Sequence, residues 1–315
     1  MTNPWKTSIY LQREQLARLL QEPLAQLAEQ CGPAWGDRER MNTVLLHGFP
    51  SIPHCTYLYC VDTNGLQLCD NIGPEGLVNG HFGRDRSQRP YMKEAVPAWG
   101  YLLSDAYISL LKKRPSLTAL QIIRVNGTPT GYLGADFDLR NLPVSAELYE
   151  EPGIWRQVKG DPAIRGNVMY QCRVDSPMDK SLEQSFSILE ELLTDRGVFQ
   201  CLIHYSSSQA TIWTIDDPYR YRILDQEALS DPDICLVYPP RPYPDNALVP
   251  KKDVPRILDA LKALRMADEN IYLRMSSLNL FNGMISLTFS CDGTHYMRYD
   301  EFLNKNLHFW FGTAT

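Results

Sequence analysis

The segment GRDRSQRPYMKEA, residues 83–95, gathers side chains suited to binding an anion. It carries Arg84, Arg86 and Arg89, and Pro90 separates the last of these from Tyr91. A guanidinium offers a planar fork of N–H donors that matches a carboxylate, and a tyrosine adds apolar surface with one hydroxyl. The segment is typical of a solvated, ion-paired loop, of a nucleic-acid patch, or of the entrance to an anion pocket.

Two further segments could supply the remaining walls of such a pocket. In YLLSDAYISLL (101–111), strand alternation places alternate residues on one mixed aromatic and polar face: Tyr101, Leu103, Asp105, Tyr107 and Ser109. This face fits either a polar pocket wall or an ordinary solvent-facing side. In TGYLGADFDL (130–139), Asp136 is either a carboxylate that holds a ligand amine or a hydrogen-bonded strand-end acid.

The second half of the chain contains residue types used in hydrolysis. His204, Ser206 and Asp217 could act as base, nucleophile and acid if they lay within hydrogen-bond reach of one another. No GxSxG motif supports this, and a serine-rich turn explains the same residues. The cluster from Cys291 to His295 contains two metal-ligand types, but Asp-Gly is a common turn and no CxxC or HxxxH accompanies it. We expect neither a metal site nor a cofactor.

Composition restricts the class of protein. The chain has 315 residues, with 31 basic and 37 acidic side chains and a net charge of −6, which disfavours a nucleic-acid binder or a protein of anionic membrane surfaces. No apolar run approaches the roughly 20 residues of a membrane span, and no signal peptide is visible. Eight cysteines without CxxC pairs indicate reduced core thiols. The expected location is the cytoplasm.

The elements of the first half predict an α+β module. Leucines 16, 20, 24 and 27 indicate a helix over about 8–30, kinked or restarted at Pro23, and a second helix is expected over 38–46. The expected strands are 56–62, 66–72, 101–111, 116–125 and 130–139. Asn64-Gly65 and Asn126-Gly127 are hairpin signals, and a short helix begins at Pro90.

The pattern weakens over 142–160, which predicts a domain at 1–145, a linker at 146–160 and a second α+β domain at 161–315. In that domain a helix is expected from an N-cap at Ser176 to a stop at Gly197, and another begins near Asp253. The expected strands are 198–207, 210–216, 271–277 and 284–291. The runs DDPYRYRILD (216–225) and YPPRPYPDNA (238–247) fit connecting loops or an interaction surface.

Residues 8–143 resemble the Cache sensor family, also called PDC or extended PAS-like domains. The resemblance lies in YCVDTNGLQLCDNI, GRDRSQRPYMKEA, SDAYISLLKKRPSLTALQI and GTPTGYLGADFDLRNL, which follow in the family's order. It implies a PAS-like sheet of five or six strands behind a long N-terminal helix. It also implies a pocket for a small molecule, often an amino acid or another carboxylate. The C-terminal half resembles no family.

The resemblance implies roles for single residues. Arg89 stands where the family places a ligand-carboxylate arginine, Tyr91 and Tyr107 at aromatic positions, and Asp136 where an acid meets a ligand ammonium. Further candidate contacts are Arg84, Asp105 and Ser109, while 83–88 is expected near the surface as a lid or ion-paired turn. The amino-acid-binding subgroup has Trp-Tyr after its arginine and a second acid after its tyrosine. This chain has Pro90-Tyr91 and Ser109 there.

These observations predict a non-enzymatic, two-domain sensor. Its N-terminal domain would bind a small anionic or zwitterionic, amino-acid-like metabolite, and the signal would pass to a protein partner or within a homodimer. No nucleic acid, membrane span or cofactor is expected. The alternatives are a hydrolase-like enzyme around His204, Ser206 and Asp217, and a structural adaptor with a side-chain-filled core and no cavity beside Arg89.

Overall fold

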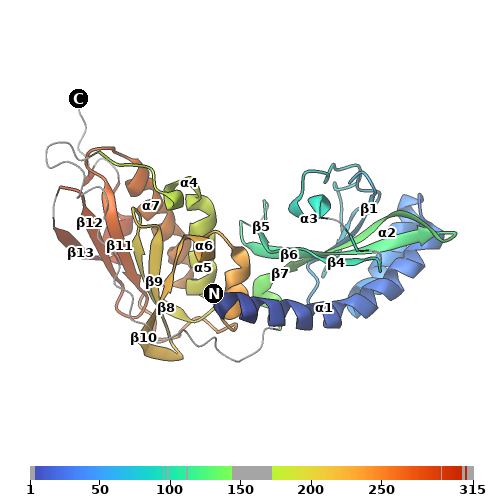
Figure 1. Cartoon of the computed structure of the whole chain (residues 1–315), viewed down its shortest axis with the longest axis horizontal. Coiled ribbons are helices and arrows are strands. Elements are labelled where there is room, and N and C mark those ends of the chain that lie inside the picture. The colour runs from blue at the N-terminus through green and yellow to red at the C-terminus, as the bar shows by residue number, and fades with distance from the viewer. Residues whose placement is uncertain are drawn as a thin grey trace. The chain divides into compact units, whose positions relative to one another are not determined.

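The computed structural model describes residues 4–94, 96–97, 99–110, 113–143, 172–291, 293–306 and 309–310. The chain divides into two compact units, unit 1 at Met1–Ser145 and unit 2 at Ala146–Thr315 (Figure 1). Each unit combines helices with one antiparallel sheet, so the α+β prediction is confirmed. The predicted linker at 146–160 lies outside the described residues.

The long first helix is α1 (Pro4–Cys31), which continues through Pro23 as one element. Its leucines at 16, 20, 24 and 27 are at most 2% exposed and form the predicted buried stripe. After the short 3-10 helix η1 (Gly32–Ala34), Asp37 caps α2 (Arg38–Gly48) by accepting from the backbone N–H of Arg40. A second 3-10 turn, η2 (Phe49–Ser51), leads into the sheet.

The sheet of unit 1 has seven strands: β1 (Tyr57–Asp62), β2 (Asn71–Gly73), β3 (Gly76–Val78), β4 (Tyr101–Leu103), β5 (Tyr107–Ile108), β6 (Pro115–Val125) and β7 (Thr128–Asp138). The order is β3-β2-β1-β7-β6-β4, and β5 also pairs with β6. Asn126 and Gly127 both have positive φ, as the predicted hairpin turn requires. After the Asn64-Gly65 turn, Leu66 and Gln67 form isolated bridges to Asp85 and Val61, and the predicted strand 66–72 begins at Asn71.

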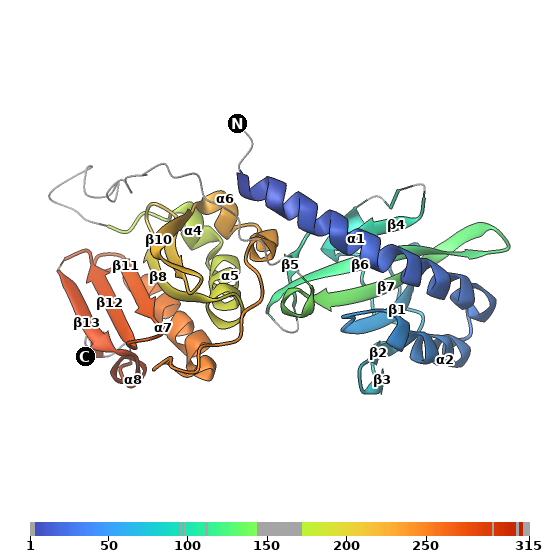
Figure 2. The same cartoon turned by 90° about the horizontal axis from the view of Figure 1, so that it is seen from below.

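The two faces of this sheet have different covers. Helix α1 runs along one face, and α3 (Pro90–Lys93) lies on the other (Figures 1 and 2). Paired residues share a face, so Tyr57, Thr118 and Asp136 point together to the side of α3. Leu117, Ala119, Ala135 and Phe137 point to the other side and are at most 1% exposed. A polar face and an apolar face are thus separated by one layer of backbone.

The predicted single strand 101–111 is wrong, and so is its simple alternation. Leu103 pairs with Ala119 and Tyr107 pairs with Ser116. Four steps along 103–107 therefore match three steps along β6, so one extra residue lies between β4 and β5. Because one extra residue reverses the face of everything beyond it, Tyr107 lies on the polar face while Leu103 lies on the face of α1. Residue 111 lies outside the described residues.

Unit 2 has a six-stranded antiparallel sheet in the order β10-β9-β8-β11-β12-β13. Its strands are β8 (Val198–His204), β9 (Gln209–Thr214), β10 (Asp217–Leu224), β11 (Leu273–Asn279), β12 (Met284–Phe289) and β13 (Thr294–Arg298). Its helices are α4 (Pro177–Lys180), α5 (Leu182–Asp195), α6 (Gln226–Leu229), α7 (Val254–Met266) and α8 (Tyr299–Leu303), with 3-10 turns η5 (Pro232–Val237) and η6 (Lys251–Asp253).

Local signals predicted both ends of the first helical stretch of unit 2, but the single helix expected there is divided at Ser181 into α4 and α5. Ser176 and Asp179 form a capping box at α4, and Gly197 has a φ of +71° just beyond α5. The segment 216–225, expected as a loop or surface, is mostly the edge strand β10, and β13 was not predicted. Both strands are largely exposed, which removes the apolar alternation that identifies strands.

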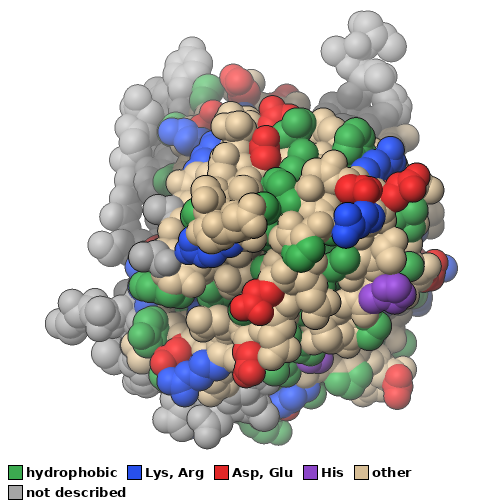
Figure 3. Space-filling model, turned by 90° about the vertical axis from the view of Figure 1, so that its right-hand side faces the viewer, with side chains coloured by type: hydrophobic (Ala, Val, Ile, Leu, Met, Phe, Trp, Pro, Cys, Tyr) green, Lys and Arg blue, Asp and Glu red, His purple; other side chains and the backbone are tan. Residues whose placement is uncertain are grey.

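The eight cysteines are free thiols, six buried and two exposed. No described helix is long and apolar enough to cross a membrane. On the face shown in Figure 3, the basic and acidic side chains of the described residues are interspersed rather than gathered by sign.

Candidate ligand-binding site in unit 1

A cavity of about 110 Å³ opens on the polar face of the unit 1 sheet. Its wall combines strand residues of β1, β6 and β7 with residues of the 84–91 segment and β5. The lining residues are Thr56, Tyr57, Asn71, Arg84, Arg86, Arg89, Tyr91, Tyr107, Ser109, Ser116, Asp136, Phe137 and Asp138. Sequence segments 56–57, 71, 84–91, 107–109, 116 and 136–138 therefore meet at one place.

Arg86 is the buried arginine of the cavity wall, with a side chain only 5% exposed. Its Nε donates to Gln67 Oε1 at 2.7 Å, and its Nη2 donates to Asn71 Oδ1 at 3.0 Å. The guanidinium carbon lies 3.6 Å from the centroid of the Tyr59 ring, a cation–π contact. The segment 83–88 was expected near the surface, but Arg86 enters the interior because Gln67 and Asn71 supply buried acceptors there.

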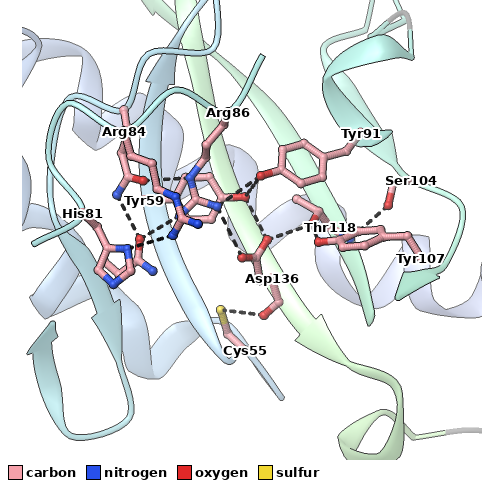
Figure 4. A network of polar contacts seen from close by, with 12 residues as sticks. Cys55, Tyr59, His81, Arg84, Arg86, Tyr91, Ser104, Tyr107, Thr118 and Asp136 are labelled. Atoms are coloured by element: carbon pink, nitrogen blue, oxygen red, sulfur yellow. Dashed lines mark hydrogen bonds and ion pairs between the residues drawn. The ribbon is translucent and has the colours of Figure 1, made fainter. Parts of the chain in front are cut away.

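Asp136 sits at the centre of a hydroxyl network that Figure 4 shows. Its Oδ1 accepts from Tyr59 Oη at 2.8 Å and from Thr118 Oγ1 at 2.7 Å, while Oδ2 lies 3.8 Å from Arg86 Nη1. A carboxylate has about four acceptor positions. The Asp136 side chain is 21% exposed, so Oδ2 retains capacity to accept from a ligand.

The single protons of the hydroxyls give the network a direction. Thr118 donates to Asp136, so the 2.7 Å contact between Tyr107 and Thr118 has Tyr107 as donor. Tyr59 Oη donates to Asp136 and also lies 3.0 Å from Tyr91 Oη, which accepts from Arg86 Nη1 at 3.1 Å. The hydroxyl protons of Tyr59, Thr118 and Tyr107 are therefore directed toward the Asp136 carboxylate.

Burial and the Asp136 charge keep these tyrosines protonated. Burial, followed by the nearby Asp136 carboxylate, raises the pKa of Tyr59, Tyr91 and Tyr107. Burial opposes the charged form of Arg86, but Tyr59 and Asp136 outweigh it and raise its pKa. Arg86 is thus positively charged at neutral pH, and its Nη1 lies 3.8 Å from Asp136 Oδ2.

The other two arginines of the cavity have a different environment. Neither Arg84 nor Arg89 forms an ion pair with any described residue, and Arg84 Nη1 lies 3.4 Å from His81 Nδ1. Burial and then the charges of Arg86 and Arg89 lower the pKa of Arg84. Burial and then Arg84 and Arg86 lower the pKa of His81, so its imidazole is neutral and accepts from Arg84. The site thus holds positive charge that the described residues do not neutralise.

Six of the seven residues expected at the site line this cavity: Arg84, Arg89, Tyr91, Tyr107, Ser109 and Asp136. The seventh, Asp105, is not among the lining residues. Its side chain is 82% exposed and lies 3.1 Å from Arg13 of α1, because the extra residue between β4 and β5 turns it away. Tyr91 is only 1% exposed and its hydroxyl is engaged by Arg86 and Tyr59, so it forms wall rather than an open contact. A cavity beside Arg89 contradicts the interpretation as an adaptor with a filled core.

Sequence reasoning missed Tyr59, Asn71 and Thr118. Only the strand alternation of 56–62 could have pointed to Tyr59, which shares a face with Tyr57. Glycine explains the position of its ring: a Cβ on Gly134, the residue paired with Tyr59, would lie 2.4 Å from Tyr59 Cε2. The ring lies flat over the sheet because Gly134 leaves that space empty.

The hydrolase alternative requires His204, Ser206 and Asp217 to converge, and they do not. His204 ends β8, whereas Asp217 pairs with Thr214, which itself pairs with Val198 at the start of β8. Six residues of strand separate the two ends, roughly 20 Å at about 3.3 Å per residue. Burial lowers the pKa of His204, and no carboxylate contributes to that shift. The predicted triad is therefore wrong as a catalytic unit.

In the other cluster considered, Cys291 lies between β12 and β13, His295 lies in β13, and Asp292 is outside the described residues. His295 contacts the Phe289 ring at 6.1 Å between centroids. Among the described residues, no group of three or more His, Cys, Asp and Glu side chains could hold a metal ion.

No protein-family model and no curated protein matches the chain. Among solved structures, it is similar to an extracellular ligand binding receptor from Desulfohalobium retbaense, with 14% identity and a TM-score of 0.35 over 46% of this chain and 29% of that chain. It is also similar to the ligand-binding domain of the Campylobacter jejuni chemoreceptor Tlp3 in complex with L-norvaline (17% identity, TM-score 0.34, 42% of this chain, 54% of that chain). A third similar structure is the ligand-binding domain of the Pseudomonas fluorescens chemoreceptor CtaA in complex with L-isoleucine (17% identity, TM-score 0.32, 44% of this chain, 54% of that chain). The chain spans about a third to a half of these proteins.

Proposed function

We propose that unit 1 is the ligand-binding domain of a sensor and that its cavity takes a small anionic or zwitterionic metabolite. The observation that carries the proposal is the charge of the cavity wall. Arg84, Arg86 and Arg89 come from one turn of chain and line one cavity, and two of them have no carboxylate partner among the described residues. Like charges held together and partly buried are costly unless an anion compensates them.

The lining assigns a role to each side of the ligand. Arg84 and Arg89 hold its negative group through charge-assisted hydrogen bonds. Asp136 Oδ2 accepts from an ammonium or a hydroxyl on the opposite side, because Oδ1 is already occupied by Tyr59 and Thr118. Tyr107 and Ser109 close the remaining wall. The size favours a short ligand, since a buried cavity near 150 Å³ holds a molecule of benzene's size.

Occupancy of the cavity is relayed through protein contacts. Neutralising Arg84 and Arg89 changes the field at the 84–91 segment, whose backbone is bonded to the 65–67 segment after β1 through Gln67 N–H to Arg84 O and Arg86 N–H to Gly65 O. A partner protein or a second copy would read that change. The protein is placed in the cytoplasm in this proposal, and unit 2 supplies the contact surface.

A thermal-shift screen of the full chain tests the proposal. The panel contains amino acids, short carboxylates and nucleobases, since a ligand at 100 times its Kd stabilises the folded state by about 2.7 kcal/mol. We expect stabilisation by a carboxylate or an amino acid, lost in Arg89→Gln and reduced in Asp136→Asn. Arg220→Gln, an exposed arginine of β10, is the matched control and keeps the response.

The melting temperatures of the unliganded variants separate lost binding from lost folding. The proposal fails if no member of the panel stabilises the wild-type chain. It also fails if Arg89→Gln folds and still responds to the ligand as the wild type does.

A further inference from the structure

The positive charge of the cavity exceeds what one carboxylate would neutralise. The lining contains three guanidiniums and two carboxylates, Asp136 and Asp138. Asp138 Oδ2 is held by Arg140, with Nε at 2.9 Å and Nη2 at 2.6 Å, and Arg140 does not line the cavity. Asp138 is therefore compensated from outside the cavity, and Asp136 is the carboxylate left to balance three arginines.

Arg86 belongs with Asp136 rather than with a ligand. Each nitrogen of its guanidinium already donates to Gln67, Tyr91 or Asn71, and one face of the group is covered by the Tyr59 ring. A buried arginine engaged in this way is fixed in place. Its charge compensates Asp136 at 3.8 Å, and three of its five N–H donors are already used within the wall.

Arg84 and Arg89 remain, with two positive charges. They lie at the two ends of a turn that encloses Arg86, in which Arg89 N–H donates to Arg86 O. Because the two side chains leave the chain five positions apart, each can present its own fork of donors. A monocarboxylate would neutralise one of the two charges, whereas two carboxylates would neutralise both.

From this count we infer that the ligand carries two carboxylate groups, one for Arg84 and one for Arg89, on a short carbon chain. The inference rests on the proposed function and names the class of ligand that the same cavity takes. The cavity volume of about 110 Å³ limits the length of the chain. A donor between or beside the carboxylates, an ammonium or a hydroxyl, lies against Asp136 Oδ2.

Isothermal titration calorimetry with matched ligand pairs tests the inference. The pairs are L-aspartate with L-asparagine, L-glutamate with L-glutamine, and succinate with butyrate, all at one ionic strength because salt screens such contacts. A hydrogen bond to a charged group contributes about 1.5–3 kcal/mol. The diacid of at least one pair should therefore bind about tenfold tighter or more than its partner, at about 1.4 kcal/mol per tenfold.

Variants then assign each carboxylate. Arg84→Gln should weaken binding of the diacid about tenfold more than binding of its monoacid partner, so that the preference for the diacid disappears. Arg220→Gln should change neither. The inference is overturned if the monoacid of every pair binds as tightly as the diacid, or if Arg84→Gln weakens both members of a pair equally.

The two proposals fail in different ways. Binding of monoacids that is lost in Arg89→Gln, with no preference for diacids, leaves the anion-binding function standing and removes the inference of a second carboxylate. An absence of binding by every carboxylate and amino acid tested removes both.

Discussion

Unit 1 and unit 2 both bury arginines, but they compensate them differently. In unit 2, Arg265 donates Nε and Nη2 to the two oxygens of Asp179 at 2.8 and 2.6 Å, and Arg196 pairs with Glu191 at 3.2 Å, all with side chains at most 1% exposed. In unit 1, Arg84 and Arg89 face a cavity without such partners among the described residues. Removal of one partner from a matched buried pair leaves an uncompensated charge, whereas an unmatched cation at a cavity is a candidate ligand contact.

The comparison predicts its largest effect at the matched pair. Arg265→Met leaves the Asp179 carboxylate buried without its partner, so the free energy of unfolding should fall by about 3–5 kcal/mol. Urea denaturation of the full chain measures this. Lys262→Met, which breaks surface contacts with Glu183 and Asp259, is the control and should cost less than about 1 kcal/mol. A loss below about 1 kcal/mol for Arg265→Met would contradict the burial of the Arg265–Asp179 pair.

A smaller effect is expected where unit 1 holds its network in place. Gly134→Ala places a Cβ 2.4 Å from Tyr59 Cε2 and displaces the ring on which Arg86 stacks. Overpacking of this kind costs about 1–3 kcal/mol, and the ligand response should weaken with it. Gly293→Ala, where an added Cβ meets nothing within 4 Å, is the control. Equal stability of the two variants would contradict the close packing of Tyr59 against the sheet.

The smallest expected effect compares one histidine from each unit. Burial and then Arg84 and Arg86 lower the pKa of His81, whereas burial alone lowers that of His204. An anion on Arg84 should therefore raise the pKa of His81 and leave that of His204 unchanged, as followed by NMR titration with and without ligand. Parallel shifts in both histidines would point to a general effect of the added anion.

The sign of the His81 contribution to stability follows from the same direction. Its pKa in the folded state lies below the ordinary value of 6.5, so the unfolded chain binds more protons as the pH falls through 6.5. Stability from this group is present above that pH and is lost below it. Substitution of His81 by Gln should flatten this part of the stability profile.

Local sequence signals predicted what depends on local physics. Positive φ at Asn126 and Gly127, the capping box at Ser176 and the leucine stripe of α1 each depend on residues a few positions apart. Most of the candidate pocket residues came from the family resemblance and do line one cavity. The sequence did not identify Arg86 as the buried arginine of the three. Gln67 and Asn71 accept from Arg86, and only the fold brings these acceptors to it.

Two other differences have equally physical causes. Asp105 was predicted at the site but does not line the cavity. The prediction assumed the alternation of a regular ladder, and the sequence 101–108 carries no signal for the extra residue. Strand β10 was missed because Pro218, Tyr219 and Arg220 are exposed at an irregular edge, where the register shifts between Asp217 and Tyr221. Neither the bulge nor the exposed edge strand leaves a hydrophobic pattern.

The extra residue between Leu103 and Tyr107 has a consequence for how such a site can evolve. Without the bulge, a chain of this length would pair residue 107 with Pro115 and turn it toward α1, so the cavity would lose its tyrosine without any substitution, whereas a chain one residue shorter here would keep it. Which side chain of β5 faces the cavity thus depends on the number of residues between β4 and β5 as much as on their types. In an alignment with related chains, insertions and deletions between Leu103 and Tyr107 should therefore be compared before residue identities.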